Sequence, residues 1–138
     1  MTDSYNRGMP GHSTEVVQSW MLTFPNDPDA FRSTLHPEIE WFPFEENHTR
    51  AHGVEAAMRV RQRWLDTWEE MQVEPEGLIE GGDTVLISLR VIARGKMSGA
   101  ETDVRLHLHF KVREGRVVYL FEHADKAAAL EAAGLPSG

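Results

Sequence analysis

The sequence predicts an α+β fold in which helices come first and a strongly curved, mixed or antiparallel sheet follows. Two long strand-like runs, Thr84–Arg94 and Thr102–Arg113, are joined by a Gly-Lys-Met-Ser-Gly turn. A third run, Arg116–His123, leads into an Ala-rich helix over Lys126–Ala133. Charged residues and histidines are distributed through these strands. A curved sheet with polar residues on one face is how a small domain builds a ligand cavity.

The chain before these strands begins with helical patterns. We expect residues 1–12 to form a flexible tail and a single domain to span residues 13–135. A helix capped by Ser13 or Thr14 is expected to end near Phe24, because apolar residues recur there at three- and four-residue spacing.

The next elements follow from turn and cap signals. Asp27-Pro28-Asp29 begins a short helix that the following His-Pro step ends near Leu35. Strands are expected over Glu38–Phe44 and Val73–Ile79, separated by a polar loop and the longest helix, Val54 to about Met71. Helices cluster early and strands late, as in an α+β domain.

Composition excludes several classes of function. The 138 residues suffice for one domain, and 22 acidic against 14 basic residues give a charge of −8, which argues against nucleic-acid binding. Without cysteine there is no disulfide, thiolate zinc site or cysteine nucleophile. No apolar run approaches the ~20 residues that span a bilayer, and the N-terminus lacks a signal-peptide pattern. We expect a cytoplasmic protein that does not bind membranes.

Several segments, taken in order, resemble the SnoaL-like polyketide cyclase family. They are Asp27–Trp41, Gly53–Ala56, Gly82–Glu101, Phe110–Val118 and His123–Leu135. This family has the cone-shaped fold shared with ketosteroid isomerase, limonene epoxide hydrolase and nuclear transport factor-like proteins. The resemblance implies a bent sheet wrapped around a central pocket, helices that close the cone, and a homodimer packed through the sheet. Function does not follow, because the fold hosts isomerases, cyclases, hydrolases and non-catalytic binders.

The chain departs from the isomerases at three positions. Phe42, before Pro43, matches the position of their catalytic aspartate, and Leu108 matches their second acid. His123 stands where the family has a tyrosine, whereas Asp125 is retained. Steroid-type isomerisation is therefore disfavoured.

Arg90 and Glu122 are the main candidates for catalysis. The resemblance implies that both point into the pocket, where an arginine can stabilise an oxyanion and a glutamate can act as acid or base. The alternation of apolar residues around Arg90, such as Leu89 and Val91, instead favours an outward arginine. Both orientations remain open from the sequence. We expect His123 to be an auxiliary proton carrier, with Asp125 either orienting it or capping the last helix.

Aromatic and apolar residues predict the walls of the pocket. Trp20 and Trp41 are expected to position the ligand, together with three apolar residues of the second long strand: Leu106, Leu108 and Phe110. Arg61 interrupts the apolar stripe of the longest helix and is expected to extend to the surface rather than into the cavity.

His107 and His109 lie two apart on one strand, and with Glu114 their spacing is reminiscent of half a cupin metal motif. The second half of that motif is missing, so we expect no metal and place the pair on the convex face of the sheet. No nucleotide-binding or nucleophile motif is present, and we expect no cofactor.

Two functions are compatible with these patterns. The first is a cofactor-free enzyme that carries out cyclisation, isomerisation or hydration on a small, apolar, carbonyl-type compound, with Glu122 as acid or base, Arg90 as oxyanion stabiliser and His123 as auxiliary. The alternative is a non-catalytic ligand-binding or dimerisation module, which a cavity without Arg90 and Glu122 would favour.

Overall fold

The computed structural model describes residues 12–44 and 47–136. The tail expected over residues 1–12 therefore lies outside the described residues except for its last residue. The helices are α1 (His12–Thr23), α2 (Pro28–Ser33), α3 (Val54–Thr67) and α4 (Lys126–Ala133). The strands are β2 (Leu35–Phe42), β3 (Ala51–His52), β4 (Trp68–Gly81), β5 (Thr84–Gly95), β6 (Glu101–Arg113) and β7 (Arg116–His123).

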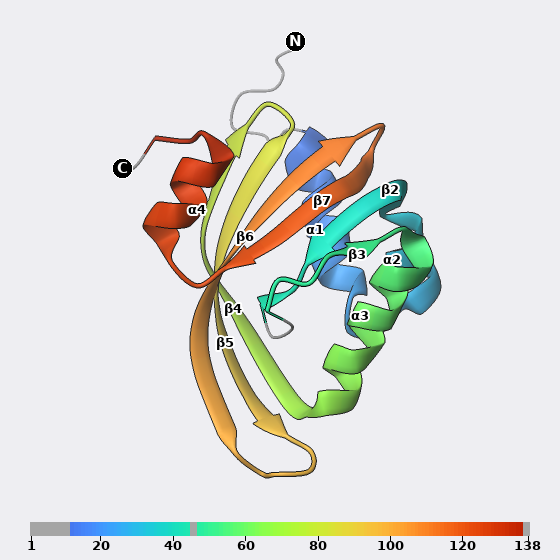
Figure 1. Ribbon diagram of the computed structural model, residues 1–138, viewed down its shortest axis with the longest axis vertical. Helices are drawn as coiled ribbons and strands as arrows, with labels where there is room; N and C mark the ends of the chain where they lie inside the picture. Colours follow the sequence, from blue (N-terminus) through green and yellow to red (C-terminus); the bar gives the residue numbers. More distant parts are fainter. Residues whose placement is uncertain (1–11, 45–46, 137–138) are drawn as a thin grey trace.

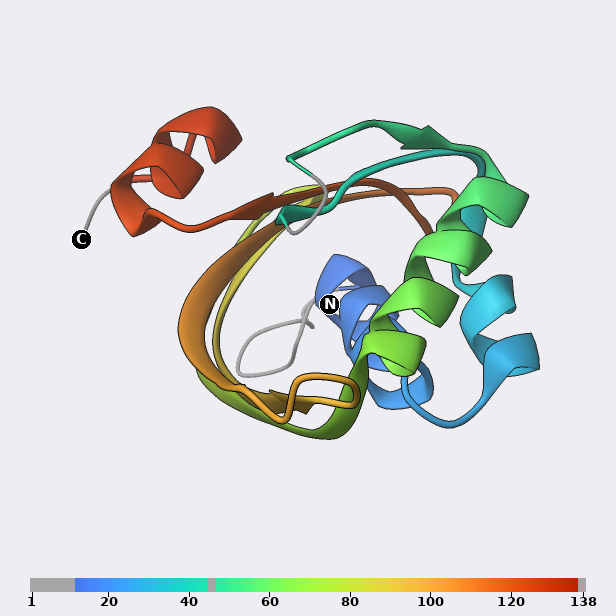
Figure 2. The same ribbon diagram turned by 60° about the horizontal axis from the view of Figure 1, so that its bottom comes forward.

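All these strands form one sheet in the order β3-β2-β7-β6-β5-β4. The β2–β7 pair is parallel and the other pairs are antiparallel. Figure 2 shows that the sheet bends around α1, that α3 closes the open side, and that α4 lies outside the curve. The predicted α+β fold with a strongly curved mixed sheet is confirmed.

Local signals account for some of the helix ends, but the expected cap of α1 is wrong, because the helix begins at His12 and Ser13 and Thr14 lie within it. The Asp27 side chain accepts a hydrogen bond of 3.1 Å from the Ala30 N–H and so caps α2. The helix α3 is shorter than predicted, because Trp68 adopts an extended conformation and begins β4 by pairing with Gly95. The two-residue strand β3 lies in a segment that we expected to be a loop.

The main core fills the concave side of the sheet. Five aromatic rings in it form a cluster, with each ring centroid 5.2 to 6.5 Å from at least one other: Trp20, Phe24, Phe31, Trp41 and Phe110. These rings connect α1 and α2 with β2 and β6. Burial of such side chains is the main driving force that holds helices inside the curve.

A smaller cluster lies on the convex side, which we call the outer face. There α4 packs Ala129 and Leu130 against Leu86 of β5. Figure 1 shows α4, in red, beside the sheet and away from the other helices. No helix in the described part of the chain is long and apolar enough to cross a membrane.

Candidate functional site

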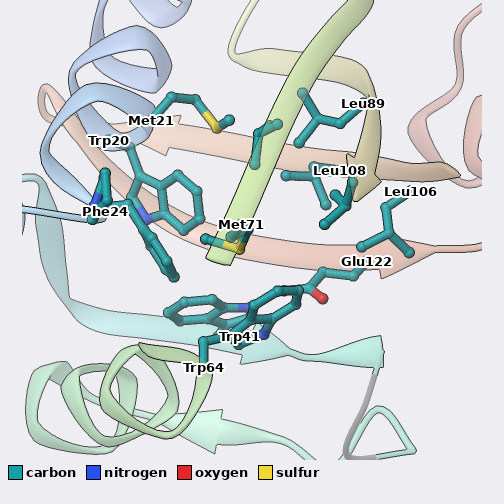
Figure 3. Close-up of a pocket in the computed structure, with 13 residues that line it drawn as sticks. Trp20, Met21, Phe24, Trp41, Trp64, Met71, Leu89, Leu106, Leu108 and Glu122 are labelled. Atoms are coloured by element: carbon teal, nitrogen blue, oxygen red, sulfur yellow. The ribbon is translucent and has the colours of Figure 1, made fainter. Parts of the chain in front are cut away.

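A pocket of about 290 Å³ lies between the concave face of the sheet and the inner helices. The helical side contributes Trp20 and Met21 from α1 and Trp64 from α3, and the sheet contributes apolar residues of β4, β5 and β6. Among the described residues, Glu122 is the one charged group that lines it. The pocket is therefore an apolar chamber with a single carboxylate, as Figure 3 shows.

The Glu122 carboxylate is buried, with only 3% of the residue exposed. The indole Nε1–H of Trp41 donates to its Oε2 at 2.7 Å, and the backbone N–H of Phe44 donates to its Oε1 at 3.1 Å. Because both partners are donors, they hold the carboxylate in place and stabilise its negative charge. Glu122 also points toward the indole rings of Trp41 and Trp64 (Figure 3).

A β-bulge directs Glu122 into the pocket. Near the Glu114-Gly115 turn, Val112 pairs with Val117, but one step further Lys111 pairs with Tyr119, so Val118 is an extra residue in β7. From that point Glu122 lies opposite Leu108, which also lines the pocket. Strict alternation from buried Val117 would have turned Glu122 outward.

The expectation that Arg90 shares the pocket with Glu122 is wrong. Arg90 lies between inward-facing Leu89 and Val91, so its side chain is on the outer face and 35% exposed. Its Nε and one terminal nitrogen donate to the two carboxylate oxygens of Asp103 at 2.9 and 2.7 Å. This pairing raises the pKa of Arg90. The alternation of apolar residues, and not the resemblance, gave the correct orientation.

His123 also lies away from the pocket, so its expected role beside Glu122 has no geometric support. It pairs with His107 and follows Glu122 in the strand, which places it on the outer face. Its ring centroid is 4.4 Å from that of Phe121, and burial lowers its pKa. Asp125 accepts a hydrogen bond of 3.2 Å from the Ala128 N–H, so it caps α4.

Four of the five predicted ligand-binding residues line the pocket, which leaves their binding role a prediction: Trp20, Trp41, Leu106 and Leu108. Phe110 does not line it, because its ring packs in the core 5.2 Å from that of Trp20. The pocket is also lined by Phe24, Trp64 and Met71, which were not among the predicted ligand-binding residues. The sequence shows the apolar helical stripe that contains Trp64, but it does not show how deeply each residue of that stripe is buried in the fold.

Arg61 does not extend to the surface as expected, since only 4% of it is exposed. Its Nε donates to the Phe24 carbonyl oxygen at 2.7 Å, and its guanidinium lies 5.6 Å from the ring centroid of Phe31. Burial lowers the pKa of Arg61. Arg61 thus stabilises the turn after α1, next to the pocket wall.

His107 and His109 lie on the outer face, as expected, and both are buried. The Nδ1 of His107 is 2.8 Å from the Ser88 hydroxyl, whereas neither ring nitrogen of His109 has a hydrogen-bond partner among the described residues. Glu114 bonds His36 instead. Within the described ranges, no three His, Asp or Glu side chains are grouped so that they could hold a metal ion.

The fold and the pocket define the class of protein: an α+β cone domain with an internal apolar chamber. Residues 21–120 match the model of the SnoaL-like domain, so the chain belongs to the SnoaL-like family. No curated protein matches the chain.

Solved structures share the fold at low sequence identity. A putative SnoaL-like polyketide cyclase from Jannaschia sp. CCS1 is 20% identical over 91% of this chain and 94% of its own, with a TM-score of 0.73. An NTF2-like protein of unknown function from Burkholderia pseudomallei K96243 is 17% identical over 88% and 97%, with a TM-score of 0.74. An LEH-like epoxide hydrolase from M. tuberculosis is 14% identical over 88% and 89%, with a TM-score of 0.69.

Proposed function

We propose that this protein binds a small, largely apolar molecule in the pocket and that Glu122 transfers a proton to or from it. The reaction class is the cyclisation, isomerisation or hydration chemistry expected from the sequence. Polyketide cyclase and epoxide hydrolase neighbours with the same fold are consistent with such chemistry.

The observation that carries this proposal is the position of one buried carboxylate in an otherwise apolar chamber. Only 3% of Glu122 is exposed, so the carboxylate has little contact with bulk water and a proton transfer to or from a bound ligand is favoured over one to solvent. The N–H groups of Trp41 and Phe44 fix the carboxylate, which keeps its distance to a bound ligand constant.

The expected carbonyl substrate loses its main support. That expectation depended on Arg90 as the partner of a developing oxyanion, and Arg90 pairs with Asp103 on the outer face. The proton-transfer role of Glu122 does not depend on Arg90, so it is retained in the proposal.

Replacing Glu122 with glutamine tests the proposal. A panel of small apolar ketones, epoxides and alkenes is first incubated with the wild-type protein and the products are followed by mass spectrometry. On any substrate found, Glu122→Gln is expected to lower kcat by about 10²–10⁴-fold, because the amide cannot transfer the proton.

The matched control is Arg90→Gln, which changes a strand residue outside the pocket and is expected to leave kcat unchanged. Full turnover by Glu122→Gln would refute the proton-transfer role. Binding of the panel compounds without any turnover by the wild type would favour a non-catalytic ligand-binding module.

A further inference from the structure

A second apolar cavity, which we call the groove, lies between α1 and the hairpin of β4 and β5 and has a volume of about 470 Å³. Among the described residues, Gln18 is the one side chain with a polar group in its lining, and none of the lining residues is charged. The apolar walls include Met21 and Leu22 of α1, Pro75 and Leu78 of β4, and Ile87 and Leu89 of β5. Such a surface suits hydrocarbon.

The groove adjoins the pocket that contains Glu122. Met21 and Leu89 belong to the walls of both cavities. Figure 3 shows these two side chains on the side of the pocket that is away from Trp41 and Trp64. The groove therefore extends the pocket on the side opposite to these two indole rings.

The pairing of β4 with β5 shows the same continuity. Three cross-strand pairs follow one another along the hairpin, and they are Val73–Val91 in the pocket wall, Pro75–Leu89 at the border and Leu78–Ile87 in the groove wall. Residues paired across two strands point to the same face of a sheet. One concave strip of the hairpin thus lines both cavities.

The groove also exposes apolar side chains to solvent. In the described part of the chain, four large apolar residues are exposed, and two of them line the groove: Leu22, which is 78% exposed, and Leu78, which is 43% exposed. Apolar side chains that gather at one exposed hollow indicate a binding surface, whereas single ones do not. This hollow adjoins a ligand pocket, so a bound ligand can cover both.

We propose that the ligand has a compact end, which the pocket holds, and an unbranched hydrocarbon tail, which passes Met21 and lies in the groove. This inference rests on the proposed function, because it names the class of molecule that the same pocket binds. The pocket, with about 290 Å³, has room for a single ring, and the larger groove takes the tail.

Met21 is suited to the border between the two cavities. Its side chain is unbranched and has three rotatable bonds, so it can adapt to a chain that passes beside it. Leu89, the other shared residue, is buried in the core of the sheet. The structure therefore assigns to Met21 the adjustable side of the passage.

The test uses three probes with the same ring and tails of different length: toluene, butylbenzene and hexylbenzene. Binding is measured from tryptophan fluorescence, since Trp20, Trp41 and Trp64 line the pocket. We expect hexylbenzene to bind about tenfold more tightly than butylbenzene, because the groove buries its two further methylene groups.

The probes separate this inference from the proposed function. If toluene and butylbenzene bind but hexylbenzene binds no more tightly than butylbenzene, the tail inference is overturned and the apolar pocket remains. If none of the three binds, the proposed function is contradicted as well, because the pocket then does not accept a small apolar molecule.

A charge in the groove shows where the tail lies. Leu78→Glu is expected to abolish most of the tenfold gain of hexylbenzene and to leave the binding of toluene unchanged. Met97→Glu is the matched control, because it makes the same change at a residue that is 99% exposed and outside both cavities, and it should keep the gain. The same gain in Leu78→Glu as in the wild type would overturn the inference.

Leu22→Glu places the charge on the helical wall of the groove and repeats the test if Leu78→Glu fails to fold. It too should lose the gain and keep the binding of toluene. Light scattering of each variant tests a different occupant, a second copy of the chain. A lower mass of a groove variant than of the wild type and Met97→Glu would mean that a second copy covers the groove, which would overturn the inference.

Discussion

Glu122 and Arg90 are both charged residues within apolar strands, yet they face opposite sides of the sheet. Arg90 lies in β5, where apolar residues alternate regularly and place it outside. Glu122 lies beyond the extra residue Val118, which shifts the alternation of β7 by one position. The alternation of apolar residues therefore predicts the orientation of Arg90. No local sequence pattern predicts the bulge, so the orientation of Glu122 followed only from the family resemblance.

The titration of His109 is strongly shifted by its surroundings. Burial, and to a lesser extent the charges of Lys111 and His123, lowers its pKa from 6.5 to about 4. Folded His109 is therefore neutral at pH values where the unfolded chain takes up a proton. Stability is expected to be complete above pH 6.5 and to decrease as the pH falls from 6.5 to about 4.

Between pH 7 and pH 5 this effect is expected to lower the free energy of unfolding by about 2 kcal/mol. Urea denaturation of the wild type and of His109→Leu at both pH values measures it. The variant should lose that part of the pH dependence and keep the smaller part that comes from His107 and His123, whose pKa values burial also lowers. The same pH dependence in both proteins would contradict the prediction.

At the scale of elements, caps and turns were the most reliable signals. Asp27 and Asp125 cap the helices that the sequence assigned to them, and Gly134 ends α4 with a φ of 70°. The end of α3 was missed, because the helical stripe continues through Trp68 in the sequence. Pairing of Trp68 with Gly95 in a long hairpin outweighs the local helical preference, and such a partner is not visible locally.

Removing the cap of α4 is expected to loosen this helix. In Asp125→Ala the Ala128 N–H loses its acceptor, and the free energy of unfolding should fall by about 1 kcal/mol. Asp125→Asn keeps an acceptor oxygen and should be near the wild type. Chemical denaturation and amide exchange at Ala128 measure both. If Asp125 acted mainly by orienting His123, Asp125→Asn would shift the pKa of His123 in an NMR titration. In that case Asp125→Ala would leave the free energy of unfolding unchanged.

At the scale of the whole molecule, the early helices and the late strands predicted the architecture, and the order of segments predicted the family. The family model over residues 21–120 supports the second point. The volume and the depth of the pocket depend on how far the sheet curves, and this depends on many bulges and long-range contacts. The sequence therefore predicted a chamber with Trp20 and Trp41 in its wall, but not the contribution of Trp64 or Met71.

The homodimer implied by the family resemblance stays a prediction. Half-buried rings lie together on the outer face of β2 and β7, where Phe121 is 5.5 Å from Phe42 and 4.3 Å from the ring of His48. If a second copy packs there, light scattering should give twice the mass of one chain, and Phe121→Glu should give monomers. Leu22→Glu, on α1 and 78% exposed, is the control that should leave the dimer intact. A monomeric wild type would rule the prediction out.

The bulge at Val118 has a consequence for how such proteins can diversify. Loss of Val118 itself would leave the remaining pairs of β6 and β7 as they are, so the carboxylate would still face the chamber. Loss of one amino acid between the bulge and Glu122 would instead turn the residues that follow it to the opposite face, bring the imidazole of His123 into the chamber and turn the carboxylate out. A deletion of three nucleotides there could thus exchange the acid of the chamber for a base.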